Sequence, residues 1–309
     1  MFYFEIFNSK HKIFITLIFF VVSNLNLSSL FYLTNYYTKK NIIFTFWEPR
    51  REVPGYLQLC MKTWKKFLPN YEIKILDYKS VQEILGEKLF SSVVCKNMTL
   101  PIQADAIRVA ILNNFGGIWM DPDIVILNGE FMENLKHYEL AMVGDDNSKR
   151  QDIGFIYSSK NSSLLKDWLD EIILRVKKYK QIIFNTDISL NGSEEMKEVK
   201  IWHYLGNGII DKFLRNTTGN MFYRIDRNTI NSFPERKFYK NSSFNNIQKY
   251  RLFYFQKRDP KIVLNNSRDI LYLHNSWTPI EYKKMSASKF IRQDILLSKL
   301  LASILNKKI

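Results

Sequence analysis

Asp121 and Asp123 are the residues of this sequence best suited to hold a divalent cation. In an extended segment, residues two apart point to the same side, so both carboxylates and Trp119 should share one face. Pro122 favours an extended Asp121 and fixes its own backbone angle. Two carboxylates so close repel each other unless a cation lies beside them, and such oxygen ligands suit Mg²⁺ or Mn²⁺. The alternative is a solvated Asp-Pro-Asp turn, which so short a motif taken alone favours.

A second pair of charged residues lies in an apolar helical pattern over 100–115. Asp105 and Arg108 are three apart, on neighbouring positions of one helix face. Unpaired charges in a buried helix are costly, so the two side chains should pair with each other or meet a polar ligand. With a ligand, the aspartate would accept from hydroxyl groups and the arginine would donate to an anion. Gly116 and Gly117 permit a tight turn that would bring this pair to the two aspartates.

The elements before this block alternate between strands and helices. We expect strands over 41–47 and 71–76 and helices over 56–67 and 79–85. This order predicts an α/β fold with a mainly parallel sheet. Ligands of such sheets bind beyond the carboxyl ends of the strands, so Trp47 should lie near the site.

The later part of the chain is predicted except for one long stretch. We expect strands over 117–127, 139–143, 153–158 and 269–273, and helical patterns over 161–178 and 286–306. The stretch 180–260 is polar and aromatic, and it carries no pattern that predicts structure. No internal repeat or flexible interdomain linker is found.

The two ends of the chain suggest membrane contact. Residues 13–22 are apolar behind a basic flank, which is typical of a signal peptide core or a signal anchor. We expect residues 1–40 to be an uncleaved hydrophobic anchor or membrane-associated segment, with an apolar helix packed on the domain as the alternative. The C-terminal pattern over 286–306 is basic and amphipathic, so it can lie on an anionic membrane or pack on the domain of residues 41–309.

The composition limits the partners. A net charge of +15 favours anionic partners. Nucleic acid is not expected, because the basic residues are spread along the chain and no zinc-finger or RNA-binding pattern is present. Cys60 and Cys95 are the two cysteines, too few for a disulfide framework or a thiolate metal site.

The block around the aspartates resembles a known family. Ala-Asp-Ala-Ile-Arg at 104–108, followed by Phe-Gly-Gly-Ile-Trp-Met-Asp-Pro-Asp at 115–123, is similar to the core of glycosyltransferases with a DXD sugar-binding region. These include bacterial capsular polysaccharide transferases, yeast initiating mannosyltransferases and clostridial toxin glucosyltransferases. Ala104 stands where the family commonly has Ser, and Trp119 where Tyr is common. The resemblance covers about 41–160 and a short late motif, His-Asn-Ser-Trp.

The resemblance implies a GT-A type, Rossmann-like fold and a metal-dependent, retaining glycosyltransferase. The donor would be a nucleotide-diphosphate sugar and the acceptor a glycan or lipid-linked glycan, as in capsular or surface polysaccharide synthesis. Catalytic roles are implied for Asp121, Asp123 and Arg108, and a Mn²⁺ or Mg²⁺ site for Asp121, Asp123 and His274. The implied substrate-binding residues are Trp47, Asp105, Arg108, Trp119, Asp121, Asn275, Ser276 and Trp277. For the late motif alone, a strand-end histidine beside a core tryptophan is the alternative.

Other assignments stay open. The chain can be a non-catalytic membrane-binding protein that keeps the fold as a relic, or a toxin-like enzyme that modifies protein. Acceptor contacts are expected from 145–160 and 180–260, with Asp145, Asp146 and Asp152 interpreted as solvated loop acids. The expected location is a membrane: the cytoplasmic face of a bacterial inner membrane, or a Golgi-type lumenal anchor in a eukaryote.

Overall fold

The computed structural model describes residues 41–145, 150–185, 204–214, 217 and 221–306. All of them belong to the second of the chain's two units, residues 41–309. The predicted anchor over 1–40 lies outside the described residues and stays a prediction. None of the helices in the described part has both the length and the apolar character needed to cross a bilayer.

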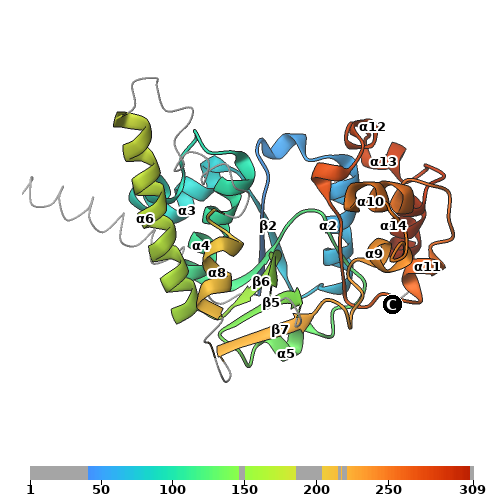
Figure 1. The fold of residues 1–309 in the computed structure, drawn as a ribbon, viewed down its shortest axis with the longest axis horizontal. Helices are drawn as coiled ribbons and strands as arrows, with labels where there is room; N and C mark the ends of the chain where they lie inside the picture. The colour runs from blue at the N-terminus through green and yellow to red at the C-terminus, as the bar shows by residue number, and fades with distance from the viewer. Residues whose placement is uncertain (1–40, 146–149, 186–203, 215–216, 218–220, 307–309) are drawn as a thin grey trace, which may run out of the picture. The chain divides into compact units, whose positions relative to one another are not determined.

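A six-stranded sheet forms the centre of the described part, in the order β2-β1-β3-β6-β5-β7 (Figure 1). β6 alone runs against the others, since it is antiparallel to β3 and β5 while the remaining neighbours pair in parallel. The predicted α/β class with a mainly parallel sheet is therefore confirmed. The strands are β1 Ile42–Phe46, β2 Glu72–Leu76, β3 Gly117–Met120, β5 Leu140–Asp145, β6 Arg150–Ser158 and β7 Phe222–Asp226.

Helices cover both faces of this sheet. Figure 1 shows α3, α4, α6 and α8 on one side, and α2 with the C-terminal helices α9 to α14 on the other. Every residue of β1 is buried between these layers, as its apolar sequence requires. The helices are η1 Arg50–Glu52, α2 Gly55–Phe67, α3 Tyr78–Val93, α4 Leu100–Phe115, α5 Met132–Leu135, α6 Ser163–Asn185, α8 Asn207–Phe213, α9 Pro234–Phe238, α10 Asn246–Tyr254, α11 Lys261–Leu264, η4 Asn275–Trp277, α12 Ile280–Lys283, α13 Ala287–Phe290 and α14 Leu296–Asn306.

The prediction of one strand over 117–127 is wrong. β3 ends at Met120, and β4 (Ile124–Ile126) leaves the central sheet to pair antiparallel with β8 (Ile270–Tyr272). The Asp-Pro-Asp segment is the junction between the two sheets. It therefore draws the late part of the chain to the end of β3.

The prediction of one helix over 286–306 is also wrong. Asp294 lies in the break between α13 and α14 and forms ion pairs with Lys257 (2.8 Å) and Lys299 (2.5 Å). The Ser298 hydroxyl donates to the Phe290 carbonyl at 2.7 Å and holds the two helices together. The apolar side chains of α14 are buried in the core, so this face packs on the domain and does not meet a membrane.

Candidate active site

The two aspartates lie in a tight turn at the end of β3. Ile124 N donates to Asp121 O at 3.0 Å, while Asp121 N donates to Gly154 O of β6 at 2.7 Å. The extended backbone predicted for this segment is therefore wrong, because the chain must turn here to leave the sheet. Both carboxylates nevertheless line the same cavity, as predicted. A Cβ at Gly154 would lie 3.1 Å from Asp121 Oδ2, so the glycine leaves room for this carboxylate.

Arg108 connects helix α4 to the turn. Its Nη2 lies 3.2 Å from Asp105 Oδ1 and 3.2 Å from Asp121 Oδ1. Its Nη1 donates to the Ile153 carbonyl at 2.5 Å. The indole of Trp119 is buried, and its Nε1–H donates to the same Asp121 oxygen at 2.8 Å. The predicted cluster of charged residues is thus present, and Arg108 and Trp119 hold Asp121 in place.

Burial opposes ionisation of these carboxyl groups. It raises the pKa of Asp105 to about 7, although the Arg108 guanidinium favours the charged form. It also raises the pKa of Asp121, against the effects of Arg108 and the Trp119 hydrogen bond. Burial, together with repulsion from Asp121, raises the pKa of Asp123 to about 7. A cation in the cavity would relieve this repulsion.

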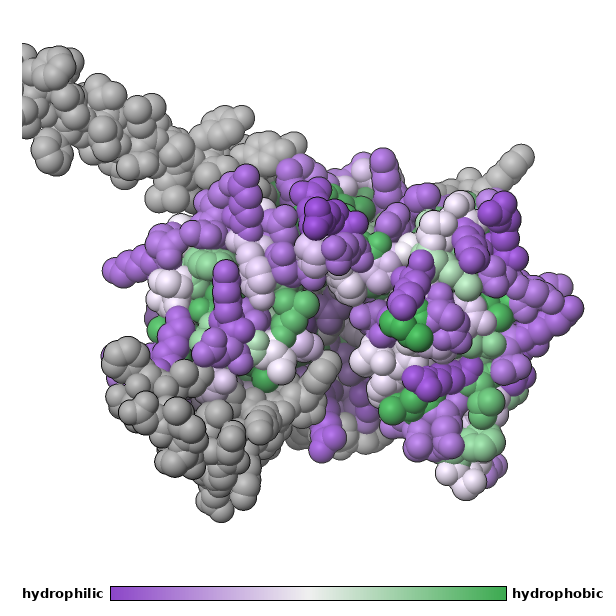
Figure 2. All heavy atoms as spheres, turned by 90° about the horizontal axis from the view of Figure 1, so that it is seen from above, coloured by the Kyte–Doolittle hydropathy of each residue, from purple (hydrophilic) through white to green (hydrophobic). Residues whose placement is uncertain are grey.

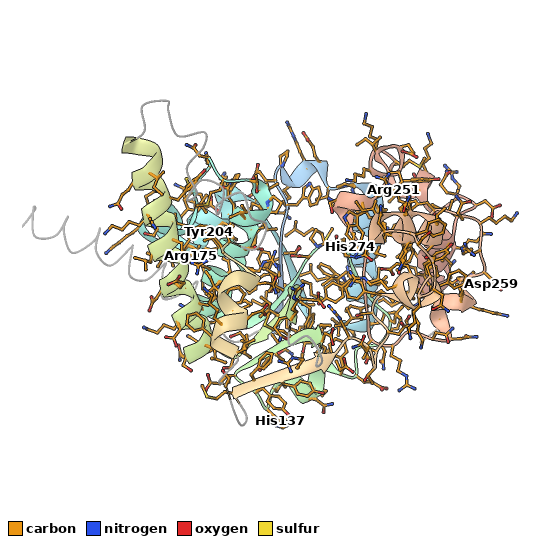
Figure 3. All side chains as sticks on the ribbon, viewed as in Figure 1. His137, Arg175, Tyr204, Arg251, Asp259 and His274 are labelled. Carbon is orange, nitrogen blue, oxygen red and sulfur yellow. The ribbon has the colours of Figure 1, made fainter. Side chains whose placement is uncertain are left out.

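The late motif closes on Asp123. The Asn275 backbone N–H donates to Asp123 Oδ2 at 2.8 Å, and the Tyr56 hydroxyl donates to the Asn275 side chain at 2.6 Å. His274 lies between the central sheet and the C-terminal helices (Figure 3), stacked on Phe233. Its Nε2 is buried and has no hydrogen-bond partner among the described residues. Burial and the nearby Arg236 lower the pKa of His274 to about 3, so the ring is neutral.

Asp121, Asp123, His274 and Asn275 line one cavity of about 660 Å³, a size that suits a small-molecule ligand. Viewed from above, the surface is largely hydrophilic and is hollowed near its middle (Figure 2). Trp47 packs against the core at the end of β1 and is not part of the lining, nor are Asp105, Arg108 and Trp119. The lining residues are Pro101, Asp121, Asp123, Gln151, Asp152, Ile153, Gly154, Asn207, Phe233, Arg236, Asn246, Tyr272, Leu273, His274, Asn275, Ser276 and Trp277.

Comparison with known proteins identifies the family. Residues 8–254 match the family model described as "Capsular polysaccharide synthesis protein". The chain belongs to this family. The resemblance to proteins of capsular polysaccharide synthesis, predicted from the Asp-Pro-Asp block, is confirmed.

Three of the solved structures with detectable similarity are described as glycosyltransferases. The PaToxG glycosyltransferase has 16% sequence identity and a TM-score of 0.34, and the match covers 63% of this chain and 78% of that chain. A glycosyltransferase involved in glycosylation of the major capsid of PBCV-1 has 10% identity and a TM-score of 0.37, with 79% of this chain and 96% of that chain covered. The glycosyltransferase GlyE of Streptococcus pneumoniae TIGR4 has 13% identity and a TM-score of 0.36, with 87% of this chain and 67% of that chain covered. No protein with a curated description matches the chain.

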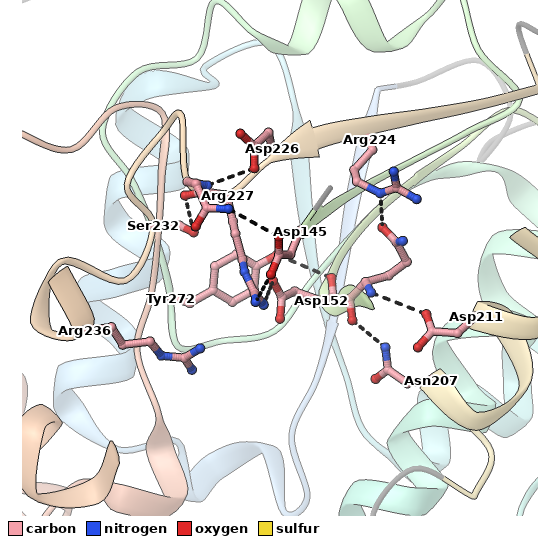
Figure 4. A network of polar contacts seen from close by, with 12 residues as sticks. Asp145, Asp152, Asn207, Asp211, Arg224, Asp226, Arg227, Ser232, Arg236 and Tyr272 are labelled. Atoms are coloured by element: carbon pink, nitrogen blue, oxygen red, sulfur yellow. Dashed lines mark hydrogen bonds and ion pairs between the residues drawn. The ribbon is translucent and has the colours of Figure 1, made fainter. Parts of the chain in front are cut away.

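Arg227 is at the centre of a network of polar contacts (Figure 4), and its partner Asp152 lines the cavity. Arg227 Nη2 lies 2.9 Å from Asp145 Oδ2, and its Nη1 lies 3.4 Å from Asp152 Oδ2. The interpretation of Asp145 and Asp152 as solvated loop acids is therefore wrong, since both are paired and largely buried. Asp146 lies outside the described residues. The network fixes the β6 segment that carries Asp152 and Gly154 into the cavity.

Glu235 lies behind the same wall, fully buried in α9. Neither of its carboxyl oxygens has a hydrogen-bond partner among the described residues. Its closest opposite charge is Arg236 Nε, 3.8 Å from Oε1. Burial raises the pKa of Glu235 to about 7 from an ordinary value of 4.5.

We expect Glu235→Gln to stabilise the protein at alkaline pH. The folded-state pKa lies above the unfolded one, so ionisation costs the wild type stability as pH rises from about 4.5 through 7. The variant should lie within about 1 kcal/mol of the wild type at pH 5 and exceed it by up to about 3 kcal/mol at pH 8. Urea unfolding at both pH values measures this. Glu281→Gln, at an exposed position of α12, should change neither value, and an equal gain at pH 5 in Glu235→Gln would contradict the explanation.

Proposed function

We propose that this protein is a glycosyltransferase that moves a sugar from a nucleotide-diphosphate sugar to a glycan or lipid-linked acceptor of capsular or surface polysaccharide synthesis. The observation that carries the proposal is the pair Asp121 and Asp123, which line one cavity at the end of β3. The adjoining residues hold each carboxylate in a fixed place, through Arg108 on one side and the Asn275 N–H on the other.

The chemistry of this pair fits a divalent cation. Within the described residues, no salt bridge compensates Asp123, although it is partly buried beside a second carboxylate. Mg²⁺ and Mn²⁺ are commonly bound by one or two carboxylates together with substrate phosphates and water. Of the described His, Cys, Asp and Glu residues, no three come together as a metal site. The proposed ligands are therefore Asp121 and Asp123, with phosphate oxygens completing the site, and the predicted ligand His274 does not form a three-residue group with them among the described residues.

The roles of the chain's own groups follow from their positions. When bound, the cation would neutralise charge on the departing diphosphate. Trp119 and Arg108 orient Asp121. The Asn275 backbone N–H orients Asp123, and the Tyr56 hydroxyl in turn holds the Asn275 side chain. Retention at the anomeric carbon is part of the proposal and rests on the family resemblance. It needs no separate nucleophile where the leaving phosphate takes the acceptor proton.

A thermal-shift screen tests this proposal. The full chain is heated with UDP, GDP, CDP, ADP and their common sugar conjugates, with and without Mn²⁺. We expect one base to raise the melting temperature by several degrees, and only with metal, because binding to the folded state stabilises it by mass action. The matching nucleotide sugar should then be hydrolysed slowly. Stabilisation by none of the nucleotides would reject the function.

The same screen addresses the competing functions. A non-catalytic membrane-binding protein predicts binding to anionic vesicles without nucleotide binding. A toxin-like enzyme would hydrolyse the donor but transfer its sugar to protein, which labelled donor with cell lysate would show. We propose a membrane-associated location because of residues 1–40, and fractionation of cells expressing the chain with and without that segment tests it.

A further inference from the structure

A cationic side chain beside the metal would favour binding of a diphosphate in this cavity, but Arg108 is not free to supply that charge. Its side chain is 5% exposed, and it does not line the cavity. Its donors are already engaged with partners in the protein, namely the carbonyls of Ala104 and Ile153 and the carboxylates of Asp105 and Asp121. A ligand would have to break this cluster to reach the guanidinium. The structure thus assigns Arg108 to the support of Asp121.

Arg236 is the one lysine or arginine among the described residues that line the cavity. Its side chain is 36% exposed, and its Nε has no hydrogen-bond partner in the described part of the chain. The guanidinium carbon lies 3.9 Å from the centre of the Phe233 ring. Stacking of this kind holds the plane of the guanidinium and leaves its N–H edges available. In Figure 4 no contact joins Arg236 to the other residues drawn.

The acids near Arg236 leave its charge poorly balanced. Glu235 lies 3.8 Å away, but burial raises the pKa of this carboxyl to about 7, so it is only partly ionised near neutral pH. Asp152 is paired with Arg227. A guanidinium presents parallel donors that fit two oxygens of one phosphate, and such contacts are among the strongest hydrogen bonds in proteins.

Arg236 also lies on the wall that meets the two aspartates. Phe233, on which it stacks, is itself stacked on His274 at a centroid distance of 5.6 Å. The next residue, Asn275, donates its backbone N–H to Asp123. We propose that Arg236 is the anion-binding residue of this cavity and that it binds the diphosphate of the donor beside Asp123. This inference rests on the proposed function, and an acidic group on the acceptor offers the same chemistry.

Calorimetric titration of the full chain with Mn²⁺ present tests the assignment. The probes are inorganic pyrophosphate, UDP and GDP, the corresponding free nucleosides and glucuronate. We expect Arg236→Gln to weaken pyrophosphate and the preferred nucleoside diphosphate by about 10- to 100-fold, the usual range for a hydrogen bond to a charged group. Nucleoside binding should not change. The diphosphate affinity of Arg236→Lys should lie between those of the wild type and Arg236→Gln, because lysine keeps the charge but lacks the paired donors of the guanidinium.

Lys237→Gln is the matched control, because it removes a positive charge from the next position of α9, which lines a different pocket. It should bind every probe as the wild type does. Unchanged diphosphate affinity in Arg236→Gln would overturn the inference while leaving the proposed function intact, as would a loss confined to glucuronate. A wild type that binds no nucleoside diphosphate would reject both. If Arg236→Gln fails to fold, the diphosphate affinity of Arg236→Lys tests the assignment instead, since lysine retains the charge beside Glu235.

Discussion

Asp123→Asn should abolish metal-dependent turnover while leaving the fold intact. The substitution removes the carboxylate charge from the proposed cation site, whereas the amide oxygen can still accept from the Asn275 N–H. Loss of a metal that supplies several kcal/mol of transition-state stabilisation lowers donor hydrolysis or transfer by at least about 1,000-fold. The same variant should lose the Mn²⁺-dependent part of nucleotide stabilisation in the thermal-shift screen.

The stability of this variant separates a site defect from misfolding. Asp123 is partly buried beside Asp121, so its charge costs stability. At pH values above neutral, removing that charge should leave the unfolding midpoint unchanged or raise it. Asp170→Asn, at an exposed position of α6, is the control and should keep full activity. Wild-type turnover in Asp123→Asn would reject the metal site, whatever the fate of the fold.

The core of this site was predictable because it is local in sequence. Asp105, Arg108, Asp121 and Asp123 lie within 100–128, and the turn at Gly116 and Gly117, both with positive φ, returns the chain from α4 to β3 beside them. Charge pairing inside an apolar helix and a two-glycine turn are signals that a single sequence carries.

The rest of the site depends on distant pairings that no local pattern specifies. Leu273 N donates to Asp123 O because β8 pairs with β4, about 150 positions earlier in the chain. The late motif was found through the family resemblance and not through its own pattern. Tyr56 of α2 and Arg227, which follows β7, contact the lining residues Asn275 and Asp152 only because of how these elements pack. Tertiary packing sets these registers, so periodicity does not reveal them.

Arg236 illustrates the same limit most clearly. It lies in α9, five residues long, inside the stretch 180–260 for which no structure was predicted. Short helices carry too few turns for a hydrophobic period to stand out. Its importance comes from what surrounds it in space, which is a cavity with acids on one side and no other described lysine or arginine in its lining.

Arg108→Met should destabilise the protein strongly. Removing one partner from a buried ionic cluster leaves uncompensated charge, and such changes cost about 3–5 kcal/mol. Here Asp105 loses its ion pair (3.2 Å) while 8% exposed. The loss should be largest at pH 8 and shrink toward pH 5, because the pKa of Asp105 is already about 7 and protonation removes the unpaired charge. Urea unfolding at both pH values measures the effect.

A second substitution shows whether the unpaired carboxylate is the cause. Arg108→Met combined with Asp105→Asn should recover part of the lost stability at pH 8, because the buried charge is gone. Arg51→Met is the matched control: Arg51 pairs with Glu52 at 3.7 Å while 86% exposed, so its loss should be small. A double variant no more stable than Arg108→Met would mean that the arginine acts through its packing against Trp119, at 5.4 Å, and not through charge. In either case the loss appears without ligand, which distinguishes a residue that holds the site together from one that binds the donor.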